Sequence, residues 1–407
     1  MPALLDAYEP IIGRQRIDEL RFLAGRLKGR RIQHINSTAV GGGVAEILSR
    51  LIPLTLELGV HAQWDVIKGG EAFFAVTKKF HNALHGQRVS LTAHDYRVFL
   101  EANAMNLRTI RLEGDLIFIH DPQPAGLVKA KPQHGGRWIW RCHIDVSAPH
   151  LGVWTFLRRF VEEYDSAIFS AAPFAQRLSI RQFLIAPSID PLSDKNRDLP
   201  EEAVTKVVQR LQVPTDLPLV TQISRFDRLK DPVGVIEAFR IVRKSVPCRL
   251  LLAGGGATDD PEGAQVLAEV RARAKGDPDI LILELPPDSH VEINALQRAS
   301  AVVVQKSIRE GFGLTVSEAL WKAKPVVASA VGGIPLQIQH KYSGLLCRSI
   351  EGCAFAIKQC LNNPAFARKL GENGREHVRQ NFLLTRQLKE HLLLAVAIEG
   401  KDDVIHL

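Results

Sequence analysis

The chain has 407 residues, of which 46% are hydrophobic, and its 52 Lys and Arg outnumber its 44 Asp and Glu to give a formal net charge of +8. That length predicts two domains, each large enough for its own core. The excess charge is modest and spread along the chain, without the basic stripe and interleaved aromatic residues typical of a nucleic-acid binder.

No apolar run approaches the roughly 20 residues that cross a bilayer, so we expect no contact with a membrane. The N-terminus lacks the basic and then apolar layout of a secretory signal. The five cysteines are odd in number and include no CxxC pair. This usage predicts reduced thiols in a cytoplasmic protein, with no disulfide and no metal site.

Short apolar runs alternate with helical patterns through the first half. Strands are predicted at 31–36, 61–67, 115–120, 137–141 and 182–186, and helices at 44–58, 96–107 and 151–164. A polar, proline-rich stretch begins at Pro187. We therefore predict an N-terminal, acceptor-binding domain over residues 1–187 and a linker over residues 188–216.

A second alternating set follows. Strands are predicted at 219–223, 249–253, 280–283, 301–305 and 325–329, and helices at 233–246, 261–275 and 291–298. The second domain is placed at 217–383, with a final helix at about 384–407 that packs back on the first domain. This order predicts an α/β protein of two doubly wound, Rossmann-like domains that face each other across a cleft, where the carboxyl ends of the strands bind ligands.

The most informative motif follows the strand at 301–305. Glu310 and Glu318 lie 318 − 310 = 8 positions apart, around Gly311 and Gly313. A helix is predicted from about Gly313, and a helix N-terminus presents unpaired N–H groups and the positive end of its dipole to a phosphate. With a carboxylate at each end of this phosphate cradle, the pattern predicts a nucleotide-sugar site.

Two cations follow the strand at 219–223. Arg225 and Lys230 lie at the carboxyl end of that strand, where doubly wound domains bind ligands. Fixed cations stabilise the charge that develops on a leaving nucleoside diphosphate, and they need no metal to do so. The pattern predicts a diphosphate site, and the alternative is an ordinary pair of surface charges in a loop.

The first half carries weaker candidates. Gly42 and Gly43 open the helix at 44–58 and permit a ligand to come close, although their spacing is not that of a dinucleotide fingerprint. His143 follows the strand at 137–141 and could hydrogen-bond a sugar hydroxyl or be an ordinary core histidine.

Three polar residues at strand ends are candidate contacts for an acceptor sugar. Asp121 and Gln123 lie in the turn after the strand at 115–120, and Asn36 ends the strand at 31–36. Two prolines bracket this turn, and an equally good explanation is that its residues have only a structural role.

Together these residues resemble the retaining GT-B glycosyltransferases, the family that includes sucrose synthase and bacterial glycogen synthases. Arg225, Lys230 and Glu310-x7-Glu318 fall in that family's order. The segments HINSTAVGGGVAEIL, WRCHIDVSAP and SIREGFGLTVSEALWKAKPVV are similar to the trehalose glycosyltransferring synthases. The likeness runs from about residue 10 to residue 395.

The resemblance implies a reversible, retaining transfer of glucose from a nucleoside-diphosphate glucose, such as UDP-glucose or ADP-glucose, to free glucose. The product would be α,α-trehalose, and no cofactor would be required. A homodimer is compatible with these observations.

By the same resemblance, Arg225 and Lys230 bind the donor diphosphate, Glu318 holds the ribose hydroxyls and Glu310 contacts the donor glucose. His143 contacts the donor sugar near its 6-hydroxyl. The remaining donor-binding residues that the resemblance implies are Gly42, Gly43, Gly311, Phe312, Gly313, Leu314 and Thr315. Asp231, where the family often has glycine, and Lys306, where it usually has an apolar residue, are departures that could alter donor affinity.

Other functions stay open. A retaining trehalose phosphorylase would use the same cations for inorganic phosphate, and another GT-B transferase would use a different acceptor sugar. An epimerase acting on a nucleotide sugar would need no acceptor pocket. A catalytically inactive nucleotide-sugar sensor is disfavoured because Arg225, Lys230 and Glu310 are all present.

Overall fold

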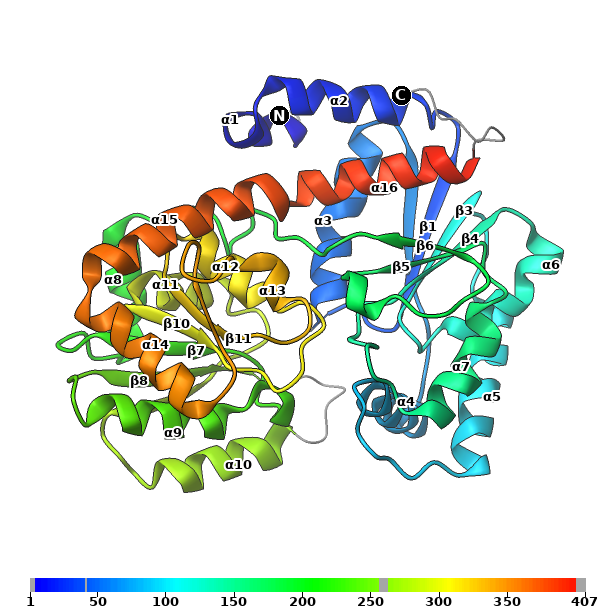
Figure 1. The fold of residues 1–407 in the computed structure, drawn as a ribbon. Coiled ribbons are helices and arrows are strands. Elements are labelled where there is room, and N and C mark those ends of the chain that lie inside the picture. The colour runs from blue at the N-terminus through cyan, green and yellow to red at the C-terminus, as the bar shows by residue number, and fades with distance from the viewer. Residues whose placement is uncertain (1–3, 41, 256–262, 400–407) are drawn as a thin grey trace. The chain divides into compact units, whose positions relative to one another are not determined.

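The computed structural model describes residues 4–40, 42–255 and 263–399. The chain divides into two compact units, of which unit 1 comprises residues 1–187 and 384–407 and unit 2 comprises residues 188–383. Each unit contains one six-stranded parallel sheet with helices packed on it (Figure 1). The prediction of two doubly wound α/β domains is therefore confirmed. Among the described helices, none is both long enough and apolar enough to span a membrane.

The sheet of unit 1 has the order β2-β1-β3-β4-β5-β6. Its strands are β1 Arg31–Asn36, β2 His61–Val66, β3 Leu116–His120, β4 Arg137–Arg141, β5 Ser166–Phe169 and β6 Arg181–Leu184. The central strands β3 and β4 are almost wholly buried, as expected where helices cover both faces of a parallel sheet.

Helices of unit 1 come from both ends of the chain. The α-helices are α1 Glu9–Ile12, α2 Arg14–Gly25, α3 Gly43–Glu57, α4 Glu71–Leu84, α5 Ala93–Thr109, α6 Lys131–His134, α7 Leu151–Val161 and α16 Leu384–Glu399, and the 3-10 helices are η1 Leu5–Tyr8, η2 Ala125–Ala130 and η3 Ala172–Phe174. Helix α16 packs against α2 and α3. Residues 400–407, part of the predicted final helix, lie outside the described residues, as does Gly41.

The sheet of unit 2 has the order β12-β11-β10-β7-β8-β9. Its strands are β7 Leu219–Ile223, β8 Arg249–Gly254, β9 Ile280–Glu284, β10 Val302–Gln305, β11 Val326–Ser329 and β12 Leu345–Cys347. Its helices are α8 Glu201–Arg210, η4 Arg228–Lys230, α9 Pro232–Arg243, α10 Gly263–Ala274, α11 His290–Ala299, α12 Leu314–Trp321, α13 Ile334–Gln337, α14 Ile350–Asn362 and α15 Pro364–Asn381. Residues 261 and 262 of the predicted helix at 261–275 lie outside the described residues.

Alternation along β8 shows why both faces of this sheet are covered. Leu250 and Leu252 join one hydrophobic cluster, with residues of α9, α10 and α14, while Leu251 and Ala253 join a second, with residues of α8 and α11. Successive side chains of a strand point to opposite faces. Each face therefore has its own apolar layer, and the loops at the carboxyl ends of the strands are left to carry polar side chains.

The segment 188–216, predicted as a linker, belongs to unit 2 and contains α8. Helix α8 packs against α11, and Val208 and Val213 join the hydrophobic core there. Val208 is the only buried residue among the ten of α8. The sequence of this helix therefore resembles that of a solvent-exposed linker, which explains the prediction.

Candidate active site

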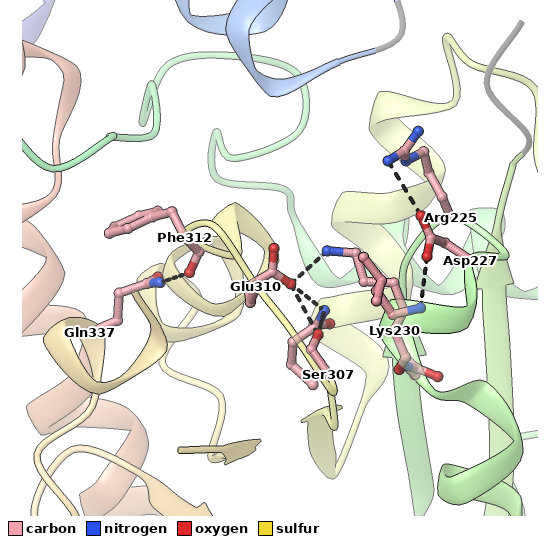
Figure 2. A network of polar contacts seen from close by, with 10 residues as sticks. Arg225, Asp227, Lys230, Ser307, Glu310, Phe312 and Gln337 are labelled. Atoms are coloured by element: carbon pink, nitrogen blue, oxygen red, sulfur yellow. Dashed lines mark hydrogen bonds and ion pairs between the residues drawn. The ribbon is translucent and has the colours of Figure 1, made fainter. Parts of the chain in front are cut away.

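Lys230 and Glu310 form the centre of the candidate site in unit 2. Lys230 ends η4, directly after β7, and Glu310 lies in the loop between β10 and α12. The Nζ atom of Lys230 lies 2.6 Å from Oε2 of Glu310, and the two side chains are only 19% and 8% exposed (Figure 2). The structure thus brings together a cation and a carboxylate that are 80 positions apart in the sequence.

The Glu310 carboxylate is held from several sides. Its Oε2 atom also accepts hydrogen bonds from the hydroxyl of Ser307 at 3.0 Å and from Nε2 of Gln305 at 3.4 Å (Figure 2). Gly332 has a φ of +56°, and a Cβ atom there would lie 1.6 Å from the Glu310 carbonyl oxygen. Glycine is therefore required at 332 for the backbone to pass so close to the Glu310 loop. This close contact holds the Glu310 loop in place.

Arg225 follows β7, at the carboxyl edge of the sheet. Its guanidinium lies 3.7 Å from the carboxylate of Asp227, and its side chain is 40% exposed. The other carboxylate oxygen of Asp227 accepts the backbone N–H of Leu229 at 2.7 Å and so caps η4 (Figure 2). Asp227 therefore shapes the turn that carries Lys230.

Asp231 and Lys306, the two departures from the resembled family, form an ion pair with each other. Asp231 has a left-handed backbone, with a φ of 50°, and its side chain caps α9 by accepting the N–H of Gly234. A left-handed position explains why glycine is common there. Here the aspartate is stabilised by its cap and by Lys306, whose charge also offsets the negative charge beside Lys230.

We expect the Asp231→Gly and Lys306→Leu substitutions to be strongly non-additive. Each single variant leaves a partly buried charge without its partner, whereas the double variant removes both charges and restores a residue suited to the left-handed backbone. The coupling free energy should fall in the range of about 0.5–3 kcal/mol found for contacting residues. Urea unfolding of the four proteins measures it, and additive losses would contradict the pairing.

Glu318 lies in α12 and is 3% exposed. Its Oε1 atom lies 3.6 Å from Nζ of Lys195, which comes from the segment that precedes α8. Lys322 donates a hydrogen bond to the Glu318 carbonyl oxygen at 3.1 Å and another to Oδ1 of Asn196 at 3.0 Å. The sequence contained no signal for Lys195, since the segment around it was interpreted as a linker.

The glycine-rich turn before α12 is held by the side chain of Gln337. Nε2 of Gln337 donates to the Phe312 carbonyl oxygen at 2.5 Å (Figure 2), and Oε1 accepts the hydroxyl of Ser317. Gly313 has a φ of 83° and caps the helix, while Leu314 and Thr315 form its partly buried first turn. The N-terminus of α12 is thus positioned by a buried amide.

His143 follows β4 in unit 1 and is partly exposed. Its backbone N–H donates to Oδ1 of Asp121 at 2.7 Å, and Asp121 itself has a φ of 65°. Burial raises the pKa of Asp121 to about 6, against the opposing effects of the His143 N–H and of Arg141. Burial, assisted by Arg141 and His391, lowers the pKa of His143 well below its usual value. The imidazole is therefore neutral.

The three predicted acceptor contacts differ in how they are used within unit 1. Asn36 donates to the Thr38 carbonyl oxygen and accepts the Trp64 indole N–H, so both ends of its buried amide are engaged. One oxygen of Asp121 is engaged by His143. Oε1 of Gln123 is buried and has no hydrogen-bond partner among the described residues.

Gly42 caps α3, and both Gly42 and Gly43 are exposed. Gly42 has an extended backbone, and a Cβ atom added to it would meet nothing within 4 Å. The packing of the described residues therefore does not require glycine at 42. Within the same described ranges, no group of three or more His, Cys, Asp and Glu side chains is arranged to hold a metal ion.

Two histidines that the sequence did not identify as functional form a row with His143. His120 ends β3, and its Nδ1 atom lies 3.1 Å from Nε2 of His143, while its Nε2 atom lies 3.0 Å from Nδ1 of His34 in β1. The sequence marks His120 as part of a polar strand end, but only the strand order places the three imidazoles together.

Comparisons with known proteins agree across the chain. Residues 34–176 match the family described as "Trehalose synthase, N-terminal domain", and residues 204–377 match "Glycosyl transferases group 1". A trehalose synthase of Rubrobacter xylanophilus is 45% identical over 410 residues, which cover 98% of this chain and 97% of that protein. A trehalose phosphorylase of Pleurotus pulmonarius is 28% identical over 457 residues, covering 96% of this chain and 60% of that protein.

Among solved structures, an α,α-trehalose-phosphate synthase (UDP-forming) from Burkholderia xenovorans superposes with a TM-score of 0.74 at 16% sequence identity. The match covers 90% of this chain and 99% of that chain. At this identity the likeness shows the fold alone, which is that of the GT-B glycosyltransferases.

Proposed function

Because the chain belongs to the trehalose synthase family of GT-B glycosyltransferases, we propose that it transfers glucose from a nucleoside-diphosphate glucose to free glucose. The reaction is reversible, keeps the α configuration of the donor and forms α,α-trehalose. Fixed cations stabilise the leaving diphosphate, so the proposed reaction needs no cofactor.

The observation that carries the proposal is the contact between Lys230 and Glu310, with 2.6 Å between Nζ and Oε2. Lys230 supplies a positive charge for the diphosphate at the point where Glu310 supplies an acceptor for sugar hydroxyls. Arg225, whose side chain is 40% exposed, is assigned to the same diphosphate. A cation and a carboxylate in contact suit a ligand in which a sugar is joined directly to a phosphate.

The hydrogen bonds around Glu310 support a front-face displacement. One oxygen of this carboxylate, Oε2, is engaged by Lys230, Ser307 and Gln305 together. A carboxylate stabilised by several donors is a poor nucleophile. In the proposed step the bond from the anomeric carbon to the leaving phosphate oxygen breaks, and the acceptor hydroxyl oxygen bonds to that carbon from the same face. The leaving phosphate oxygen takes the hydroxyl proton.

Glu318 is assigned to the ribose hydroxyls, with Lys195 as the group that orients its carboxylate. The pair, with 3.6 Å between Nζ of Lys195 and Oε1 of Glu318, gives a nearly buried carboxylate a charged partner, and the carboxylate oxygens are hydrogen-bond acceptors. A donor nucleotide needs such an acceptor, whereas inorganic phosphate does not. This contact therefore favours a nucleotide-dependent transferase over a phosphorylase.

Within unit 1, we assign sugar contacts to His143, Gly42 and Gly43. Both glycines are exposed and packing does not require glycine at 42, so we assign the backbone N–H groups at the start of α3 to a ligand. Among the acceptor candidates we favour Gln123, because its buried Oε1 atom has no partner among the described residues. Asp121 and Asn36 are better explained as residues that position their neighbours.

We expect the purified protein to make one molecule of α,α-trehalose for each nucleoside diphosphate released. Glucose labelled with ¹³C at the anomeric carbon is incubated with UDP-glucose, ADP-glucose or GDP-glucose, and the product is followed by NMR. The expected product carries one labelled and one unlabelled glucose, both in the α configuration, because the donor configuration is retained and the acceptor reacts through the 1-hydroxyl of its α anomer.

A parallel incubation with trehalose and inorganic phosphate serves as the control. Release of glucose 1-phosphate there, together with no product from any glucose nucleotide, would establish a phosphorylase and overturn the proposal. A product in which the unlabelled, donor-derived glucose has the β configuration would instead overturn retention.

A further inference from the structure

Three histidines form a hydrogen-bonded row across neighbouring strands of unit 1. His34 lies in β1, His120 ends β3 and His143 follows β4, and these strands are adjacent in the sheet. The Nδ1 atom of His34 lies 3.0 Å from Nε2 of His120. The Nδ1 atom of His120 lies 3.1 Å from Nε2 of His143. The rings of His120 and His143 stack with an interplanar angle of 18°.

Each of these contacts joins two imidazole nitrogens, so one must carry a proton and the other a lone pair. Only two arrangements satisfy both contacts in a row of neutral rings. Either every proton points from His34 toward His143, which places the proton of His143 on Nδ1, or every proton points the opposite way, which leaves Nδ1 of His143 as an acceptor. The tautomers of the three rings are therefore set together.

The surroundings keep the row neutral. His34 and His120 are each 3% exposed. Burial lowers the pKa of His34 to about 3 and the pKa of His120 well below its usual value. Arg141 and His391 face the same cluster, and both act in the same direction on His120. A proton that charged any of the three rings would be strongly disfavoured.

We propose that His120, supported by His34, is a positioning residue for glucosyl transfer that fixes the orientation and tautomer of His143. It engages Nε2 of His143, so that Nδ1 is the nitrogen left for the substrate. Asp121 holds the backbone of His143 at the same time, through a hydrogen bond of 2.7 Å. The inference rests on the proposed function, because it takes His143 as a sugar contact.

His391 supplies a matched control for the row. Its ring packs 6.2 Å from the His34 ring and 5.5 Å from the Phe118 ring, measured between centroids, and it is 6% exposed. Neither of its ring nitrogens has a hydrogen-bond partner among the described residues. His120→Phe and His391→Phe therefore make the same chemical change in the same cluster, but only the first breaks the row.

We expect His120→Phe to lower kcat by about 10²-fold, the cost of misplacing a catalytic contact, with little change in KM for either substrate. His391→Phe should keep kcat within about threefold of wild type. In a His143→Phe background, the further change His120→Phe should cost nothing more, because its effect passes through His143. A kcat of His120→Phe near the wild-type value, or additive losses in the double variant, would overturn the inference.

A second measurement does not depend on turnover. The ¹⁵N shifts of selectively labelled histidine report which ring nitrogen carries the proton. In the wild-type protein His143 should show a single neutral tautomer, and in His120→Phe it should show a mixture of the two, while His391→Phe leaves it unchanged. An unchanged His143 signal in a folded His120→Phe protein would also overturn the inference. Failure of the proposed function would appear differently, as a wild-type protein that makes no trehalose from any glucose nucleotide.

Discussion

Replacing Lys230 with alanine is expected to lower kcat for glucosyl transfer by about 10²–10³-fold, the usual loss when one fixed electrostatic contact to the transition state is removed. The structure adds a second source of loss. Lys230 is the cation that contacts Glu310 at 2.6 Å, and Glu310 is only 8% exposed. Without Lys230, the carboxylate keeps the hydrogen bonds from Ser307 and Gln305 but loses this charged partner.

Initial rates with saturating donor and acceptor test this expectation, and Lys230→Arg, which keeps the charge, is the matched variant. The Lys230→Ala/Glu310→Ala double variant should lose less than the sum of the two single losses, because each single change leaves the other charge without its ion-pair partner. Turnover of Lys230→Ala within about threefold of wild type would remove Lys230 from the proposed mechanism.

Unit 1 is expected to lose stability steeply as the pH falls below about 6.5. His34, His120 and His391 are buried, and burial holds the pKa of His34 at about 3 and those of His120 and His391 well below their usual value. The same histidines take up protons near pH 6.5 once unfolded. Between these values the unfolded chain binds more protons, so acid favours unfolding. The pKa of His143 is likewise well below its usual value, so His143 adds to the same trend.

One carboxylate opposes this trend. The pKa of Asp121 is about 6 in the folded protein, above the unfolded value of about 4, so between those values the folded form binds the extra proton. Four histidines less one aspartate leave about three protons, or a loss of about 4 kcal/mol for each pH unit below 6. A typical domain stability of about 5–15 kcal/mol would be much reduced by pH 4.

Urea unfolding followed by tryptophan fluorescence measures this slope. Four of the five tryptophans, at 64, 138, 140 and 154, belong to unit 1, so the signal reports mainly on that unit. His34→Phe should flatten the dependence on pH by about one proton, whatever it does to stability at pH 7. A slope that is the same in His34→Phe would show that this histidine does not cause the acid sensitivity.

The sequence predicted the elements that are buried and regular. The strands at 31–36, 137–141 and 219–223 were predicted with the bounds that the structure has. Strand β12 was missed since a run of three residues is too short to show a period, and β5 was missed although it is no shorter than β10 and β11. Helix α4 was missed although its buried Phe73, Val76 and Phe80 have helical spacing, because lysines and histidines lie between and after them.

The sequence named individual residues of the candidate site, but it did not predict which of them contact each other. Each of Lys230 and Glu310 was identified from its own position at a strand end, and the structure joins them. Asp231 and Lys306 were noticed separately as departures, 75 positions apart, and only the fold shows that they form one ion pair. The histidine row depends on which strands are neighbours, and that order is set by packing of the whole sheet.

The division of unit 1 between the two ends of the chain has a consequence during synthesis. Helix α16 supplies buried Leu388 and Leu392 to unit 1, yet it emerges only after the whole of the 188–383 segment. At about 5–20 residues per second, that segment takes about 10–40 s to make. Over that interval the apolar surfaces of α2 and α3 that contact α16 stay exposed to solvent. Unit 2 is continuous and can complete its fold first, so the part of the polypeptide that is made first is the last to mature.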